Sequence, residues 1–334
     1  MKATRRVLVS GAPFIHGART AARDAWFVSA LLVLVLVWES LLSGWGSLIV
    51  AGVAVGTALL AELLQSGLRR RFELDDGSGF LTGLLIALAL PPGLPIYVPI
   101  VAAAFAILVV KGAFGGLGNN WMNPALGGLA FAWLDWPSQF TTALHSASPL
   151  APLLPNLPHL LVGFDEWASA ALNSLLFQPL GATMPSGYFA SLLGLGAGGV
   201  PGVPMGLVLA LSTILIGKRI IHWQIPAAMF AFFALPTWIF GDVASTGFFS
   251  GDALGHSLAG PFFLVAFFMA TDPVTSPSRQ ARMIIFGGAS GVLAFLFVYF
   301  GATALAPILA VLFMNTLMPF IDESASRLLR GRRG

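Results

Sequence analysis

The sequence predicts an all-α polytopic membrane protein of about ten transmembrane helices in two inverted five-helix repeats, each with a half-helix broken at membrane depth. Three observations predict this fold. Of the 334 residues, 57% are hydrophobic and only 9% are charged, far outside the soluble globular range. Two short apolar runs end in prolines at matching positions. All lysines and arginines fall on one side of the predicted helices.

The two short apolar runs are residues 78–93 (SGFLTGLLIALALPPG) and the stretch that ends at residues 266–277 (AFFMATDPVTSP). A gapless alignment places Pro91 on Pro273, and the tetrapeptides NPAL and APIL then follow at nearly the same spacing. Each run has about fourteen apolar residues, or about 21 Å of helix, which is less than the roughly 30 Å of bilayer hydrocarbon. Broken helices at this depth are tolerated where their freed backbone groups line a cavity or a ligand. The paired breaks therefore predict a site between the repeats.

The predicted spans, in chain order, cover residues 25–43, 46–66, 79–91, 95–112, 122–135, 203–217, 223–240, 259–271, 283–300 and 303–321. They divide the chain into an N-terminal arm (1–24), a first repeat (25–136), an outer loop (137–202), a second repeat (203–321) and a basic tail (322–334). The arm is basic and lacks a compact apolar core followed by a cleavage site, so we expect it to be retained.

The 17 lysines and arginines all lie on the side of these spans that carries the N-terminus. The connections on the other side carry Asp165, Glu166, Asp242 and Asp252 and no basic residue. The positive-inside rule then places both termini in the cytoplasm. An odd number of spans per repeat makes the second repeat enter from the opposite side. The net charge of +3 follows from this sidedness and indicates no nucleic-acid partner.

Several classes of redox and metal site are excluded or disfavoured. The chain has no cysteine, which excludes disulfides and thiolate-held iron–sulfur clusters. Its five histidines fall in loops or at span ends, which argues against haem ligation within the helices. No zinc-binding motif and no hydrolase nucleophile is present, so we expect neither a metal site nor a catalytic residue.

The most informative part of the outer loop is residues 177–187 (FQPLGATMPSG). Thr183 follows two small residues, Gly181 and Ala182, which allow another molecule to approach the backbone closely. A simpler interpretation is a turn that enters the next helix, with Thr183 or Ser186 as its N-cap.

Five segments carry a family resemblance: residues 80–92, 111–128, 222–226, 266–280 and 312–322. With them, nearly the whole chain resembles the RnfD/NqrB family, the membrane subunits of the Rnf and sodium-translocating NADH:quinone reductase complexes. The resemblance implies electron transfer through flavins and an FMN joined by a phosphoester to the threonine of a Ser/Thr-Gly-Ala-Thr motif. That threonine corresponds to Thr183, beside Gly181 and Ala182. Leu180 occupies the hydroxyl position of the motif, and Phe177 stands where an aspartate often lies.

Two further groups of polar residues are candidates for a ligand site. Asn119, Asn120 and Asn123 lie among small residues, which suit either a close helix contact or an amide edge that hydrogen-bonds a flavin ring. The expected cofactors are FMN on Thr183 and a second, non-covalent flavin whose position the sequence does not specify. The glycines before them lack both the spacing and the preceding strand of a nucleotide-binding loop.

Asp272, with Thr271 and Thr275, ends the second half-helix. An acid at membrane depth is a functional candidate by default, and its alternative role is an ion pair with Arg279. Glu39 and Glu62 lie near span ends, where we expect them at the membrane interface.

We therefore expect a flavin-containing electron-transfer subunit of an oxidoreductase complex in the bacterial cytoplasmic membrane. Coupling to Na⁺ or H⁺ movement is part of this expectation. Because the chain has no cysteine and no nucleotide-binding domain, it cannot oxidise NADH alone, and its expected partners are other Rnf/Nqr-type subunits, a flavin transferase and the lipid bilayer. The alternatives are a small-solute transporter or channel of inverted-repeat fold and a scaffold subunit without flavin.

Overall fold

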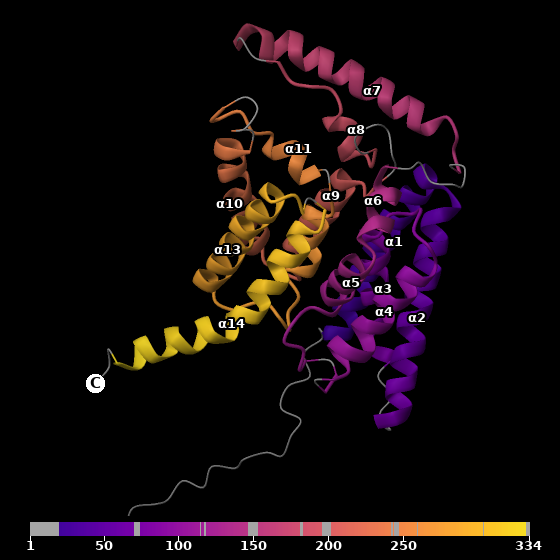
Figure 1. The fold of residues 1–334 in the computed structure, drawn as a ribbon, viewed down its shortest axis with the longest axis vertical. Coiled ribbons are helices and arrows are strands. Elements are labelled where there is room, and N and C mark those ends of the chain that lie inside the picture. Colours follow the sequence, from indigo (N-terminus) through magenta and orange to yellow (C-terminus); the bar gives the residue numbers. More distant parts are fainter. Residues whose placement is uncertain are drawn as a thin grey trace, which may run out of the picture.

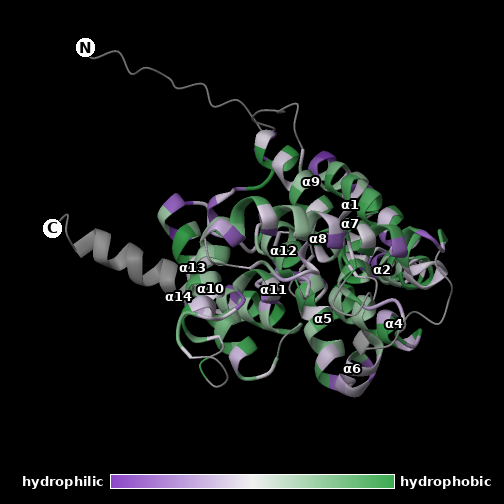
Figure 2. Cartoon of the chain, turned by 90° about the horizontal axis from the view of Figure 1, so that it is seen from above, coloured by the Kyte–Doolittle hydropathy of each residue, from purple (hydrophilic) through white to green (hydrophobic). Residues whose placement is uncertain are grey.

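The computed structural model describes the chain as a set of packed helices (Figure 1). It describes residues 20–69, 74–113, 115–116, 118–145, 153–180, 183–195, 202–241, 243, 247–258, 260–302 and 304–331. Every regular element in this part of the chain is an α, 3-10 or π helix, which confirms the predicted all-α class for these residues. The helices before residue 136 gather on one side of the molecule, and α10, α13 and α14 gather on the other (Figures 1 and 2).

The first two helices form a long hairpin. α1 (Ala21–Ser43) begins after Thr20, whose side-chain oxygen accepts a hydrogen bond from the Arg23 N–H at 3.2 Å. Gly44 then turns the chain with a φ of 74°, a conformation that glycine adopts without a Cβ clash. α2 (Trp45–Arg69) packs on α1 and on α3.

The next elements form the first break predicted from the sequence. α3 (Ser78–Ala89) ends at Leu90, which has the extended conformation expected before a proline. Its 12 residues span about 18 Å, too short to cross a bilayer. α4 (Tyr97–Ala104) continues into a π-helix, η2 (Phe105–Lys111). α5 (Pro124–Asp135) then follows an asparagine cap.

The described residues of the long connection to the second half are largely helical. Outside this connection, the 3-10 helix η1 (Leu74–Asp76) lies directly before α3 in the first half. The connection itself contains α6 (Pro137–His145), α7 (Leu157–Leu172), the π-helix η3 (Asn173–Phe177), the 3-10 helix η4 (Gln178–Leu180) and α8 (Tyr188–Leu192). Prolines open α6 and α7, where their fixed φ favours a helix start. Figure 1 shows α7 lying across one end of the molecule, above α8.

The second half also combines long and short helices. It contains α9 (Met205–Gly217), α10 (Gln224–Phe240), α11 (Ala253–Leu258), α12 (Phe262–Leu264), the π-helix η6 (Val265–Met269), α13 (Gln280–Tyr299) and α14 (Ala306–Gly331). α12 and η6 form one short continuous helix that ends before Pro273, as predicted. α14 runs beyond the predicted end of the last span at residue 321.

Helix length and surface composition identify a polytopic membrane protein. α1, α2 and α13 are each long and apolar enough to cross a membrane, and several shorter apolar helices accompany them. In Figure 2 much of the helical ribbon has the green colour of hydrophobic residues. Large apolar side chains such as Leu60, Leu68 and Phe300 remain 68%, 78% and 79% exposed, which suits contact with lipid. The number of spans and the inverted relation of the two halves remain predictions.

Candidate functional site

A cavity of about 670 Å³ opens between the two halves of the chain. Its wall comes from the start of α1, the first half of α3, the end of η2 and the segments before α5, before α10 and after η6. Its polar and charged lining residues are Thr20, Asp24, Asp76, Ser78, Thr82, Lys111, Asn120, Asn123, Thr271 and Asp272. The break after η6 therefore lines this cavity, whereas Leu90, at the break after α3, is not part of its wall.

Asp272 lies in this wall, held by uncharged donors. Its carboxylate accepts hydrogen bonds from the Thr275 hydroxyl at 3.2 Å, the Asn123 amide at 3.4 Å and the Val274 N–H at 3.2 Å. Thr271 is buried and donates its hydroxyl to a backbone carbonyl of η6 at 2.5 Å. Thr271 and Asp272 therefore line the cavity. Thr275 does not line it but donates a hydrogen bond to Asp272.

The alternative role predicted for Asp272, an ion pair with Arg279, is wrong. Arg279 is exposed at the start of α13, and no ion pair joins these two described residues. A carboxylate at membrane depth is costly unless it is paired, wetted or bound to a ligand. Among the described residues Asp272 has no ion-pair partner, and it borders the cavity.

Asn123 links the two halves of the chain. Its Nδ2 donates to the Met269 carbonyl at 3.2 Å and to Asp272. Its Oδ1 accepts from the N–H groups of Ala125 and Leu126 at 2.9 and 3.2 Å, which caps α5. An amide has two donor hydrogens and two acceptor lone pairs, so this side chain is fully used. Asn123 thus serves the close contact between the halves, the first of its two predicted roles.

Asn120 is the polar side chain that this wall leaves unsatisfied. It is 7% exposed, lines the cavity, and its Oδ1 is buried without a hydrogen-bond partner in the described part of the chain. A buried, unpaired amide oxygen in a native fold calls for water or a ligand. Asn119 is exposed and does not line the cavity; its Nδ2 lies beside Gly115 instead.

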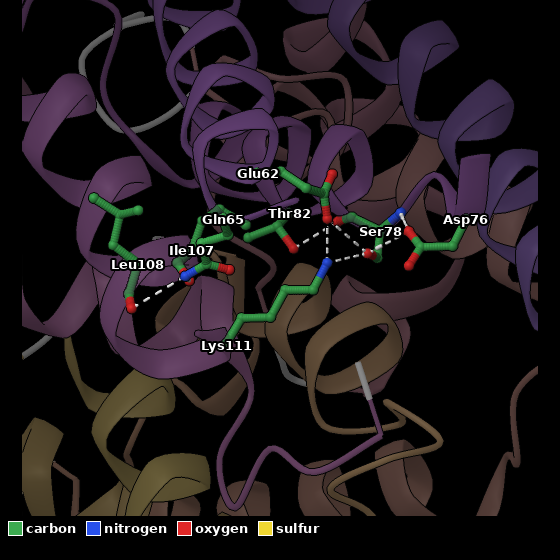
Figure 3. Close-up of polar contacts among 8 residues, drawn as sticks. All are labelled: Glu62, Gln65, Asp76, Ser78, Thr82, Ile107, Leu108 and Lys111. Carbon is green, nitrogen blue, oxygen red and sulfur yellow. Dashed lines mark hydrogen bonds and ion pairs between the residues drawn. The ribbon is translucent and has the colours of Figure 1, made fainter. Parts of the chain in front are cut away.

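A charged network that was not predicted from the sequence reaches the same wall (Figure 3). Lys111, at the end of η2, forms an ion pair with Glu62 of α2, and these side chains are only 2% and 1% exposed. The lysine also donates to the Ser78 hydroxyl at 2.5 Å, and that hydroxyl lies 2.5 Å from Asp76. The Glu62 Oε2 has no hydrogen-bond partner among the described residues. The network therefore places one end of a buried ion pair, Lys111, at the edge of the cavity.

The expectation that Glu39 and Glu62 lie at the membrane interface is wrong for both. Glu62 is buried in its ion pair, and Glu39 is 2% exposed, with a hydrogen bond from the Ser47 hydroxyl at 3.1 Å. The signal that could have found them is an acid inside an apolar span, which marks a functional candidate. Their position near span ends misled the prediction because a helix end can be covered by neighbouring helices.

Thr183, the candidate residue for flavin attachment, does not line the cavity. It is exposed in the connection between η4 and α8, so its hydroxyl is accessible from outside the helix bundle. Gly181 and Ala182 lie outside the described residues. The expectation that Thr183 or Ser186 caps the next helix is wrong, because the cap residue of α8 is Gly187 and it makes no side-chain cap.

The N-terminus of α8 is instead capped from α7. Asp165 is 3% exposed and accepts hydrogen bonds from the N–H groups of Gly187, Phe189 and Ala190 at 2.6, 2.9 and 3.1 Å. On the other side, burial and a hydrogen bond to the Asp252 carboxylate raise the pKa of Tyr188 to about 12. These contacts fix α8 directly after the Thr183 segment.

The cavity and Thr183 lie toward opposite ends of α1. Thr20 and Asp24, at the start of α1, line the cavity. Near the other end, Trp38 donates to the Leu193 carbonyl at 2.7 Å, just beyond α8. The 23 residues of α1 span about 34 Å. The two candidate sites are therefore separated by much of the thickness of the molecule.

Comparisons with known proteins place these features in a family. The family model described as NQR2, RnfD, RnfE matches residues 8–329. The chain is 31% identical to a component of the proton-translocating ferredoxin:NAD(+) oxidoreductase complex of Clostridium ljungdahlii, over 97% of this chain and 96% of that protein. It is 32% identical to a component of the ion-translocating oxidoreductase complex of Haemophilus ducreyi, over 96% of this chain and 97% of that protein.

Proposed function

Because this chain belongs to the NQR2, RnfD, RnfE family, we propose that it is the flavin-containing electron-transfer subunit of an ion-translocating oxidoreductase complex in the bacterial cytoplasmic membrane. The observation that carries the proposal is the exposed hydroxyl of Thr183, beside an anchored helix and after the Gly-Ala pair of the family motif. A hydroxyl can form a phosphoester, and an exposed one is accessible to a modifying enzyme.

FMN bound at Thr183 would supply redox chemistry that this chain lacks in its own side chains. The attachment bond would join the Thr183 Oγ to the flavin phosphate. The role of the chain is then to hold the cofactor on one side of the membrane and to leave its ring accessible to a partner subunit. Leu180 stands at the hydroxyl position of the motif, so we propose that Gly-Ala-Thr alone suffices for attachment.

A second, non-covalent flavin fits the cavity at the other end of α1. The volume of about 670 Å³ lies within the range of about 300–1,000 Å³ that ligand pockets occupy. The unpaired Oδ1 of Asn120 offers an acceptor for a ring N–H. Lys111 and Asp272 add charges of opposite sign to the wall. Asn120, Lys111, Thr271 and Asp272 are thus the side chains we propose for this cofactor, with Asn123 and Thr275 as their support.

We also propose that ion movement is coupled to electron transfer at Asp272. The names of the relatives support an ion-translocating complex, and a carboxylate on a cavity wall with no ion-pair partner among the described residues suits a transient Na⁺ or H⁺. The complex would contain other membrane and peripheral subunits, and a flavin transferase would load Thr183. In this proposal the halves are inverted repeats with both termini in the cytoplasm, so Thr183 faces outward.

The test is in-gel flavin fluorescence of the full chain, expressed with a flavin transferase and separated under denaturing conditions. We expect a fluorescent band for the wild type and none for Thr183→Val, which is nearly isosteric but has no hydroxyl. Ser186→Ala, which alters a neighbouring exposed hydroxyl, is the matched control and keeps the band. A colourless wild type that conducts a small solute in liposomes would favour the transporter alternative.

A further inference from the structure

The segment that carries Thr183 is held by two side chains of the helix that crosses above it. Asn173 stands where α7 widens into the π-helix η3. Its Nδ2 donates to the Met184 carbonyl at 2.9 Å, and its Oδ1 accepts from the Met184 N–H at 2.7 Å. This paired contact fixes the backbone of the residue directly after Thr183. Asp165, earlier in α7, holds the next residues through the N–H groups of α8.

We propose that Asn173 and Asp165 are positioning residues that present the Thr183 hydroxyl in one geometry to the enzyme that attaches flavin. The inference rests on the proposed function of Thr183. Three features support it beyond ordinary loop anchoring. The Asn173 contact is immediately beside the acceptor residue, Thr183 itself stays exposed while Met184 and the start of α8 after it are held, and π-helical widenings are frequent at functional sites.

The amide of Asn173 suits this role because it forms its hydrogen bonds with backbone groups rather than with a side chain. With one donor and one acceptor it matches both polar groups of Met184, as a neighbouring strand would, so the backbone cannot rotate there without breaking both hydrogen bonds. The next residue, Pro185, has a φ that its own ring fixes. The two peptide groups that flank Met184 are therefore held, and the first of them begins at the carbonyl of Thr183.

The reaction that these residues serve is a phosphoryl-type group transfer without electron transfer. The donor is an activated flavin phosphate, such as a flavin dinucleotide. The Thr183 Oγ–P bond forms, the P–O bond to the nucleotide leaving group breaks, and the hydroxyl proton passes to solvent or to the leaving group. Orientation of the attacking oxygen governs such steps, and a misplacement of about 1 Å can cost on the order of a hundredfold in rate.

The test measures the rate of flavin attachment on purified, folded full-length protein at saturating transferase and flavin dinucleotide, by intact mass over time. We expect Asn173→Ala to lower the rate constant about tenfold or more. Asn173→Asp keeps the acceptor for the Met184 N–H, so we expect it to lower this rate constant less than Asn173→Ala does. Ser174→Ala is the matched control, because that exposed hydroxyl donates a hydrogen bond to the Ala171 carbonyl at 2.9 Å within its own helix and, in the described part of the chain, to no residue of the Thr183 segment.

A second readout separates positioning from stability. The chain has no cysteine, so Thr183→Cys carries one nitroxide spin label at the acceptor position. We expect Asn173→Ala, and not Ser174→Ala, to increase the mobility of that label. An attachment rate that stays at the wild-type value in Asn173→Ala overturns the inference, whatever happens to thermal stability. A wild type that accepts no flavin would refute the proposed function instead, and the label would then report only whether the anchor exists.

Discussion

At the scale of single residues, the ion pair of Glu62 and Lys111 is the most strongly buried charged contact that the structure describes. The two residues are 49 positions apart in the chain, and both side chains are almost fully covered. A charge in such a place costs several kcal/mol unless its partner remains. Gly79 makes the arrangement possible, because a side chain there would collide with the Glu62 carboxylate.

We predict that Glu62→Gln and Lys111→Met each destabilise the protein by about 3–5 kcal/mol, because each leaves an uncompensated buried charge or donor. The double variant should recover much of the loss, since both charges are then removed together. Unfolding in detergent, followed by circular dichroism, measures all three. Additive losses in the double variant would mean that the two residues act independently.

Unlike Glu62, Asp272 accepts hydrogen bonds from uncharged groups, so a substitution there should affect electron transfer more than stability. Its partners are neutral, so Asp272→Asn keeps most of the hydrogen-bonding shape while removing the charge. We expect nearly unchanged folding and a loss of roughly tenfold or more in the steady-state electron-transfer rate of the assembled complex, the scale on which one charged group acts in a dry site. Arg279→Gln is the control and should have little effect, because Arg279 is exposed and does not contact Asp272.

The limits of sequence reasoning are clear at this scale. Asp272 could be singled out because an acid beside a proline break in an apolar run is conspicuous. The partners of Glu62 and Asp165 could not be found, because each contact joins segments that only the folded chain brings together. The unpaired Oδ1 of Asn120 and the full set of hydrogen bonds that Asn123 forms could not be predicted either, because they depend on distances in the folded chain that no spacing in the sequence specifies.

At the scale of elements, close helix contacts depend on glycines at particular faces. A Cβ on Gly83 of α3 would lie 2.7 Å from the Cα of Val55 in α2, and a backbone atom cannot move aside easily. Gly56 of α2 has no atom within 4 Å of the position its Cβ would take. The two positions differ because Gly83 faces a neighbouring helix, whereas Gly56 has open space around it.

We therefore predict opposite effects of the same substitution. Gly83→Ala should destabilise the protein by about 1–3 kcal/mol through overpacking. Gly56→Ala should be neutral or stabilising by up to about 1 kcal/mol, because alanine is the better helix former. Thermal unfolding of the purified protein in detergent compares them. Equal effects at both positions would contradict the described packing of α2 against α3.

The boundaries of the apolar helices could be predicted and those of the connection could not. α1, α2 and α10 lie within a few residues of their predicted spans because long apolar runs are an unambiguous signal. α7 was missed because it mixes apolar residues with His159, Asp165 and Glu166, as expected for a helix that lies across an end of the molecule rather than through it.

At the scale of the whole molecule, the proposal requires the two candidate sites to face opposite sides of the membrane. A reporter inserted between Pro155 and Asn156, in the turn before α7, should read as extracytoplasmic. A reporter at the C-terminus should read as cytoplasmic, because the basic residues favour that side. Alkaline phosphatase and fluorescent-protein fusions measure the two positions. Two reporters on the same face would remove the argument for inverted repeats.

The central claim is that this chain carries a covalent flavin, and the intact mass of the full-length wild type tests it most directly. The protein is expressed with and without a competent flavin transferase, purified, and weighed by mass spectrometry. We predict a gain of one FMN less one water only with the transferase, and fragmentation should assign it to Thr183. An unchanged mass in the presence of an active transferase would contradict the account.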